Sequence, residues 1–231
     1  MRESVYSLIY KTDVMKFLIL LSLTTLSFSC ANPIKKAVNK AKYEAYEMVG
    51  MEKRDLFKKE VANVKEEQEE TGEAFKDALT KLKEIYLFDG GDLEKAHGKL
   101  NSSYEEAKEK SKNVSGRITQ LDTVAQDLFT EWQNEIQEIS SADLKSKSRD
   151  RLAETRQKYN QLHKQLKTSE AKIAPVLSKL KDQVLYMKHN LNAKAIGGLK
   201  TESAKIQNDI EKLMNEMKES NAKAESLMRE L

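Results

Sequence analysis

The stretch "LEKAHGKLNSSYEEAKEKSKNVSGRITQLDTVAQDLFTEW", residues 93–132, decides the fold because its apolar residues recur with a period of seven. Two sets of heptad positions, alternately three and four residues apart, hold mostly apolar side chains. The first set is Leu93, Leu100, Ala107, Val114, Leu121 and Leu128, and the second is His97, Tyr104, Ser111, Ile118, Ala125 and Trp132. An α-helix places such residues on one face, where they pack against other helices. The stretch therefore predicts one long helix with a single buried stripe.

The same heptad spacing recurs in three further segments of the chain. Apolar residues occupy most heptad positions from Phe57 to Ile85, from Leu152 to Met187 and from Ile206 to Leu231. Some heptad positions are polar, among them Gln68, Thr71 and Ser111. Polar residues at these positions weaken the apolar core, which is expected of a flexible rod or of a rod that binds partner proteins.

The breaks between the segments carry the ordinary signals that end and begin helices. "FDGGD" (88–92) holds two glycines and then a capping aspartate, "SSAD" (140–143) offers capping residues, and "NLNAKAIGG" (190–198) is a softer break. We expect helices over residues 34–87, 93–140, 143–190 and 200–230. Pro175 lies inside the third helix and is expected to bend it. Because short connections make neighbouring helices antiparallel, the predicted fold is all-α, an elongated antiparallel bundle or coiled coil of three or four long helices.

Composition agrees with long helices and narrows the classes of partner. One third of the 231 residues are charged, 6% are aromatic, and only two prolines and eight glycines interrupt the chain. This profile is typical of long helices and not of sheet proteins. The formal net charge of +3 is close to balance, so the sequence does not indicate the one-sided basic surface that nucleic-acid binding requires. We therefore predict no nucleic-acid partner.

The N-terminal region is typical of a secretory signal peptide. Met15 and Lys16 precede the uncharged run "FLILLSLTTLSF" (17–28), which is followed by a small residue. The run is shorter than the roughly 20 apolar residues that a membrane-spanning helix needs. We predict that residues 1–29 are a signal peptide and are removed, with Met15 as an alternative start because Glu3 and Asp13 suit a signal peptide poorly.

Cys30, the single cysteine of the chain, follows directly after this signal. Leu26–Cys30 is similar to the lipobox that a lipoprotein signal peptidase recognises, although it holds Ser27 and bulky Phe28 in the middle. The alternatives are an ordinary buried cysteine and a catalytic or redox thiol, but a lone cysteine forms no internal disulfide. We predict lipidation at Cys30, a membrane-proximal stalk over residues 30–49, and a helical domain over residues 50–231 that starts at a joint at Gly50.

The chain carries no motif that predicts an enzyme or a cofactor. Its three histidines, His97, His163 and His189, are far apart and form no pair at metal-ligand spacing. "IGGLKTES" (196–203) is faintly similar to the end of a phosphate-binding loop, but Leu199 stands where that loop needs a glycine. We expect no catalytic residues, no metal, no cofactor and no small-molecule substrate.

The stretch "APVLSKLKDQVLYMKHNLNAKAIGG" (174–198) has the composition of a docking site, because apolar residues on more than one helix face precede a cluster of polar side chains. A helix end packed by its neighbours and capped by asparagines explains the same features. The candidate partner-binding residues are Tyr186, Lys188, His189, Asn190 and Asn192.

Four stretches of the chain resemble those of a known family: "GMEKRDLF" (50–57), "LFTEWQNEI" (128–136), "RDRLAETRQKYNQL" (149–162) and "PVLSKLKDQVLYMKHNLNAKAI" (175–196). The family that they resemble is an uncharacterised bacterial one, domain of unknown function 2959. The resemblance implies a helical, often lipidated envelope protein with no established activity. Some members of the family carry the label "DNA repair ATPase", which would require the phosphate loop that this sequence lacks.

Together these features predict a lipid-anchored periplasmic protein that acts as a non-enzymatic scaffold, spacer or adaptor at the cell envelope. Ala31, directly after the lipidated cysteine, would permit transfer to the outer membrane, unlike an aspartate at this position. The expected partners are the membrane, through the anchor, and an envelope protein or a second copy of the chain. The alternatives are a cytoplasmic coiled-coil accessory of DNA repair and an oligomeric envelope-stress or membrane-remodelling protein.

Overall fold

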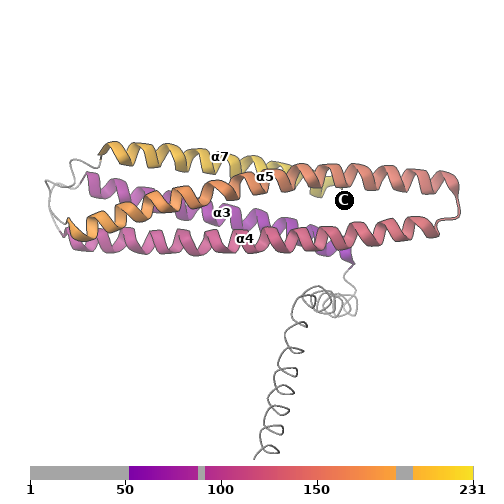
Figure 1. Ribbon diagram of the computed structural model, residues 1–231, viewed down its shortest axis with the longest axis horizontal. Coiled ribbons are helices and arrows are strands. Elements are labelled where there is room, and N and C mark those ends of the chain that lie inside the picture. The colour runs from indigo at the N-terminus through magenta and orange to yellow at the C-terminus, as the bar shows by residue number, and fades with distance from the viewer. Residues whose placement is uncertain (1–51, 88–91, 191–199, 231) are drawn as a thin grey trace, which may run out of the picture. The chain divides into compact units, whose positions relative to one another are not determined.

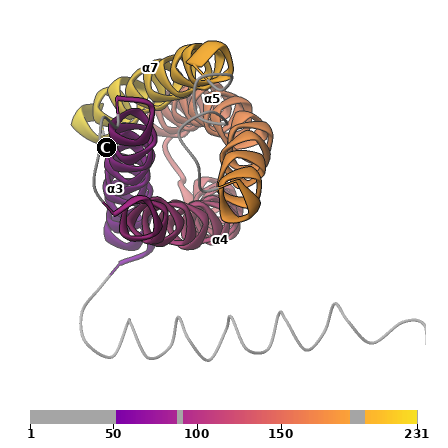
Figure 2. The same cartoon turned by 90° about the vertical axis from the view of Figure 1, so that its left-hand side faces the viewer.

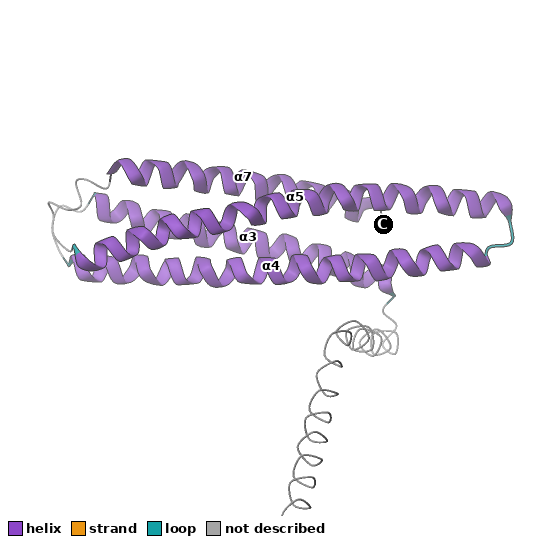
Figure 3. Ribbon diagram, in the orientation of Figure 1, coloured by secondary structure: helices purple, strands orange, loops and turns teal. Residues whose placement is uncertain are grey.

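The computed structural model describes residues 52–87, 92–190 and 200–230, except for the side chains of residues 200 and 201. The described residues form four helices and no strand (Figure 3). The helices are α3 (Lys53–Tyr86), α4 (Leu93–Glu138), α5 (Ala142–His189) and α7 (Lys200–Glu230). The predicted all-α bundle is therefore confirmed, with four helices in the described part of the chain.

The predicted helix boundaries hold within two residues except at the start of α3. Glu52 is not helical, so the expected helix over residues 34–87 is not continuous, and α3 begins at Lys53. Asp92 and Ser141 cap α4 and α5 by accepting hydrogen bonds from the backbone N–H groups of Lys95 and Leu144. The predicted signal peptide, the lipidation site and the stalk lie outside the described residues.

The four helices pack as a closed ring in which each helix packs mainly against two neighbours. Successive helices run antiparallel, and α7 packs back against α3 as well as against α5 (Figures 1 and 2). Residues 53–231 make up one compact unit. The ring gives every helix an inner face, which explains why all four segments carry a heptad stripe.

The heptad positions form the core of this ring. From the first set of α4, Leu100, Ala107, Val114 and Leu121 are fully buried, and so are Phe57, Phe75 and Leu82 of α3. Only positions near helix ends, including Leu93, His97 and Trp132, are half-buried. The buried heptad positions of α5 and α7 are Leu152, Tyr159, Leu162, Leu166, Ser169, Ile173, Val176, Leu180, Met187, Ile206, Ile210, Leu213, Met217, Ser220, Ala224 and Leu227.

Three aromatic rings join α3, α4 and α5 near one end of the bundle. Phe57, Phe129 and Tyr159 pack edge to face, with ring centroids 5.6 to 6.0 Å apart. The Tyr159 hydroxyl donates a hydrogen bond of 2.9 Å to Asp122 Oδ1. Burial, and then this hydrogen bond to a carboxylate, raise the pKa of the Tyr159 phenol far above its ordinary value. His163 stacks on the Tyr159 ring, with centroids 5.7 Å apart.

The α4–α5 hairpin is longer than the other two helices and continues past them. α4 and α5 have 46 and 48 residues, whereas α3 and α7 have 34 and 31. Lys53 and Arg54, at the start of α3, contact Glu131 and Trp132 of α4, and Arg151 of α5 donates a hydrogen bond to the Glu230 carbonyl at the end of α7. Between these points, residues 133–150 form a segment that we call the hairpin tip. Ile136 is the only fully buried residue of the tip.

Candidate functional site

The predicted docking residues lie at the C-terminal end of α5, and most of those described are exposed. Tyr186 is 42% exposed and the adjacent Leu185 is 46% exposed, although both are large apolar or aromatic side chains. Lys188 and His189 are also exposed. Asn192 lies outside the described residues. The structure therefore presents two apolar and two basic or titratable side chains on the outside of one helix end.

Asn190 has a structural role at this helix end. Its side-chain Nδ2 donates a hydrogen bond of 2.8 Å to the Tyr186 carbonyl, and its backbone N–H donates one of 3.0 Å to the Met187 carbonyl. Both bonds satisfy carbonyls that the end of an α-helix leaves unpaired. Capping is thus sufficient to explain why an asparagine stands at this position.

The inner side of the same helix end is fixed to α3 and α4. Val184 and Met187 are buried, and the Tyr86 hydroxyl of α3 donates a hydrogen bond of 2.9 Å to Gln183 Oε1. His97 Nε2 of α4 lies 3.0 Å from the Val184 carbonyl oxygen. Leu185 and Tyr186 are therefore held outward by a backbone that is packed from behind.

One further exposed apolar residue at this end of the bundle lies outside the residues predicted from the sequence. Leu87, directly after α3, is 76% exposed. Leu87 lies two residues after the heptad residue Ile85 and is not at a heptad position itself. A search for apolar residues outside the heptad positions would have identified it. We call Leu87, Leu185, Tyr186, Lys188 and His189 the end surface.

A polar layer crosses the middle of the core. Gln68 of α3 is 1% exposed; its Nε2 donates to Ser169 Oγ of α5 at 2.9 Å, and its Oε1 accepts from Ser220 Oγ of α7 at 2.6 Å. Three helices are thus joined at one level by side chains that stand at heptad positions. Thr71, one helical turn further along α3, is fully buried, but its Oγ1 has no hydrogen-bond partner among the described residues.

The described residues were compared with the arrangements that a metal site and a membrane-spanning helix need. No three His, Cys, Asp or Glu side chains within the described ranges come together as a metal site. His97 contacts the α5 backbone, His163 stacks on Tyr159 and lies 3.8 Å from Asp122, and His189 is exposed. None of the four described helices combines the length and the apolarity that a bilayer crossing requires.

Comparison with known proteins places the chain in a family without assigning it an activity. No curated protein and no solved structure matches the chain. A family match covers residues 42–231, which include all four helices, the end surface and the polar layer. The chain therefore belongs to the family described as "Protein of unknown function (DUF2959)".

Proposed function

We propose that this protein is a non-enzymatic binding protein of the cell envelope, held to the periplasmic face of the outer membrane by a lipid on Cys30. In this role it acts as a scaffold or adaptor. The observation that carries the binding role is the end surface, where Leu185 and Tyr186 are exposed on a helix end that is fixed from behind. Exposed apolar side chains beside polar groups are typical of protein interaction sites.

The anchor is supported by the sequence around Cys30. An apolar run and small or apolar residues precede the single cysteine, and Ala31 follows it. Acyl chains contribute about 0.8 kcal/mol of membrane affinity per buried methylene group, and stable anchoring takes two or more chains. A lipidated Cys30 would carry two or three chains and would therefore hold the protein at the membrane.

The end surface fits a protein partner of the envelope. Tyrosine buries a large area with few rotatable bonds, and residues of this kind dominate the binding energy of protein interfaces. Lys188 and His189 stand beside Tyr186 and would favour a partner with an acidic patch.

The test compares the wild-type protein with two variants in cells. Wild-type protein is expected to have a mature mass that begins at Cys30 and includes acyl chains, and to fractionate with the outer membrane. Cys30→Ala is expected to lose the acyl mass and the membrane association. A soluble, unmodified wild-type protein would contradict the lipid anchor and would favour the alternative, a cytoplasmic accessory protein of DNA repair. That alternative predicts DNA binding whose affinity falls steeply with salt concentration.

The second variant, Leu185→Ser with Tyr186→Ser, tests the docking role by cross-linking in intact cells. Its matched control is Leu144→Ser, because Leu144 is an apolar residue at the opposite end of the same helix and is 57% exposed. We expect the cross-linked partner to disappear from the double variant and to persist in the control, with helical circular dichroism unchanged in both. A cross-linked adduct that is identical in all three proteins would remove the end surface as the docking site. An adduct between two copies of the chain would show self-association in place of an envelope partner.

A further inference from the structure

α5 and α7 are joined by a ladder of polar contacts whose members stand seven residues apart on both helices. Because the two helices run in opposite directions, the residue numbers rise along one side of the ladder as they fall along the other. The four contacts are Lys158–Glu230, Gln165–Lys223, Lys172–Glu216 and Lys179–Asp209. Three of them are ion pairs, and in the fourth Lys223 Nζ donates a hydrogen bond of 3.1 Å to Gln165 Oε1. The ladder therefore fixes both the direction and the register of α7 on α5.

α7 contributes charges of one sign to its ion pairs with other helices. In every such pair within the described residues, α7 supplies the carboxylate and its neighbour supplies the lysine; besides the three pairs of the ladder, Lys65 of α3 lies 2.7 Å from Glu225. Between α3 and α4, by contrast, the lysine comes from α3 in one pair (Lys53) and from α4 in another (Lys110). Partly exposed ion pairs add little stability, but at the edges of a helix interface they determine which helix is accepted and in which direction. The α7 position, between α3 and α5, therefore selects an amphipathic helix with acidic edges.

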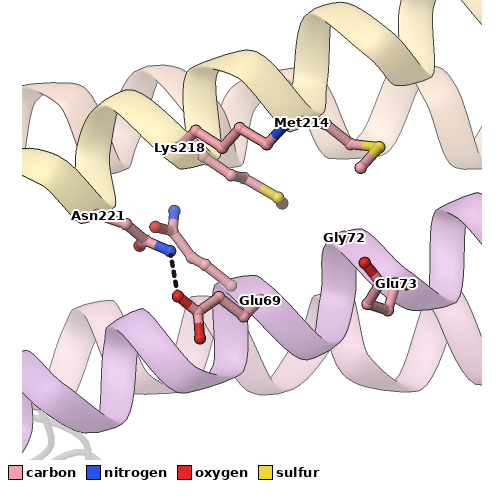
Figure 4. Close-up of a pocket in the computed structure, with 8 residues that line it drawn as sticks. Glu69, Gly72, Glu73, Met214, Lys218 and Asn221 are labelled. Atoms are coloured by element: carbon pink, nitrogen blue, oxygen red, sulfur yellow. Dashed lines mark hydrogen bonds between the residues drawn. The ribbon is translucent and has the colours of Figure 1, made fainter.

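The interface between α7 and α3 is loosely packed. A pocket of about 320 Å³ lies between these two helices at the level of the polar layer, with Gly72 and Asn221 among the residues that line it (Figure 4). Gly72 is buried, yet a Cβ atom built on it would have no other atom within 4 Å, apart from its chain neighbours and the backbone of its own helix. Asn221 Oδ1 and Thr71 Oγ1 are buried without a hydrogen-bond partner among the described residues. Unfilled space and unpaired polar atoms lower the cost of separating two helices.

A second copy of the chain carries a helix that matches the α7 position in every contact. Exchange of α7 between two copies changes only the chain from which the helix comes, so its cost is the opening of α7, which the loose interface with α3 lowers. We propose that two copies of the chain assemble by exchanging α7, so that α7 of each copy occupies the α7 position of the other. This dimer goes beyond the proposed docking role, because it uses neither the lipid anchor nor the end surface.

The test mixes two full-length copies, each with Cys30→Ala and one introduced cysteine. One copy carries Glu69→Cys on α3 and the other carries Asn221→Cys on α7, because Asn221 Nδ2 and Glu69 Oε1 lie 3.4 Å apart. The mixture is held at high concentration just below its melting temperature, where α7 opens, and is then cooled and treated with a short bismaleimide. We expect a covalent product of the two copies, since α7 of one lies on α3 of the other.

The matched control replaces Asn221→Cys by Gly98→Cys. Gly98 is exposed on α4, which does not exchange, and a Cβ atom there meets no other atom within 4 Å. The control mixture is expected to give no product above random collision. A yield from the Glu69→Cys and Asn221→Cys copies that is no greater than that of the control would overturn the proposal.

Reversal of the ladder charges tests whether α5 selects the exchanged helix. The α7-reversed copy carries Asp209→Lys, Glu216→Lys and Glu230→Lys, and the α5-reversed copy carries Lys158→Glu, Lys172→Glu and Lys179→Glu. With Asn221→Cys in the first and Glu69→Cys in the second, the two reversed copies are expected to give at least as much product as the unreversed pair, because their charges match only between copies. The α7-reversed copy mixed with an unreversed Glu69→Cys copy is expected to give at least about tenfold less.

Equal yields from these two mixtures would show that the ladder does not select α7 and would overturn the proposal. Helical circular dichroism shows that each copy is folded, and the cysteine test without charge changes stays decisive if a reversed copy fails to fold.

The exchanged dimer is distinguishable from the proposed envelope complex. In intact cells, an adduct of twice the chain mass that persists when Leu185→Ser and Tyr186→Ser are introduced reports α7 exchange, because those changes leave the α7 position intact. Failure of the lipid anchor or of the end surface would leave the mixing test unchanged, since its copies lack Cys30 and keep the ladder.

Discussion

At the scale of single residues, the polar side chains of the core differ in how well they are satisfied. Gln68 has partners on two other helices, and Ser111 donates to the Ala107 carbonyl of its own helix. Thr71 is buried as completely as either of them, yet its hydroxyl has no partner among the described residues. The sequence predicts all three as polar heptad residues, but it cannot distinguish the satisfied ones from the unsatisfied one.

Replacing Thr71 by valine tests this difference. Valine has nearly the same shape and removes the unpaired hydroxyl, so Thr71→Val is expected to raise the free energy of unfolding by about 1 kcal/mol. For a bundle of this size, that corresponds to an increase in melting temperature of about 2–4 °C. Thermal unfolding followed by circular dichroism measures the change.

The matched control is Thr155→Val on α5. Thr155 is also buried, but its hydroxyl donates a hydrogen bond of 2.9 Å to the Arg151 carbonyl. This variant is expected to lower the free energy of unfolding by about 0.5–1.5 kcal/mol. Equal destabilisation by both variants would mean that the Thr71 hydroxyl has a partner in solution.

At the scale of whole helices, the heptad pattern predicts the buried face well and the neighbours poorly. α5 continues through Pro175 to His189, as the pattern indicates. The heptad stripe stops at Trp132 and resumes at Leu152, on either side of the hairpin tip (residues 133–150), but it does not show that α3 and α7 end before the tip. Within the described residues, each helix of the tip packs mainly against the other, so the apolar area that it buries is small.

The hairpin tip is therefore expected to open more readily than the rest of the hairpin. Local opening controls hydrogen exchange, and segments with few buried contacts open at low free energy. We expect amides of the tip to exchange at least about tenfold faster than those of residues 104–125, which belong to the same hairpin and face the closed ring. Hydrogen exchange with fragment-level mass spectrometry measures both segments in one sample. Equal protection of the two would show that the tip is covered in solution.

At the scale of the molecule, the stability of the bundle depends on alkaline pH through two tyrosines, the buried Tyr159 and the half-buried Tyr86. Burial raises the phenol pKa of Tyr86 and Tyr159 well above the ordinary value of 10.0, and hydrogen bonding to Asp122 adds to the effect for Tyr159. The folded state keeps these two protons at a pH at which the unfolded chain releases them. Their contribution to stability is therefore complete below about pH 10 and is lost as the pH rises above that value.

This linkage predicts that part of the tyrosine ionisation coincides with unfolding. The chain has eight tyrosines, and the phenolate absorbance and the helical circular dichroism can be followed in the same alkaline titration. We expect a fraction of the phenolate signal to appear only as helix is lost, and the free energy of unfolding of Tyr159→Phe to fall less steeply with pH above about pH 10. Complete ionisation of all the tyrosines while the helices persist would contradict this prediction.

The sequence by itself determined the helices, their buried faces and the family. Heptad spacing fixes which side of a helix is apolar, and capping residues such as Asp92 and Ser141 fix where helices begin, because both act over a few neighbouring residues. The same local reasoning found Tyr186, Lys188 and His189 as candidates for an exposed site, and it named Asn190, for which the structure supplies a capping role.

Only the tertiary structure decided which helices meet and what lies between them. The closure of α7 on α3, the partners of Gln68 on two distant helices, and the pocket beside Gly72 and Asn221 all join residues that are 100 or more positions apart in the chain. The heptad spacing determines which face of a helix is buried, but it does not determine which helix packs against that face. The pairing is settled by how all four stripes fit together, because each helix in the ring must satisfy two partners at once.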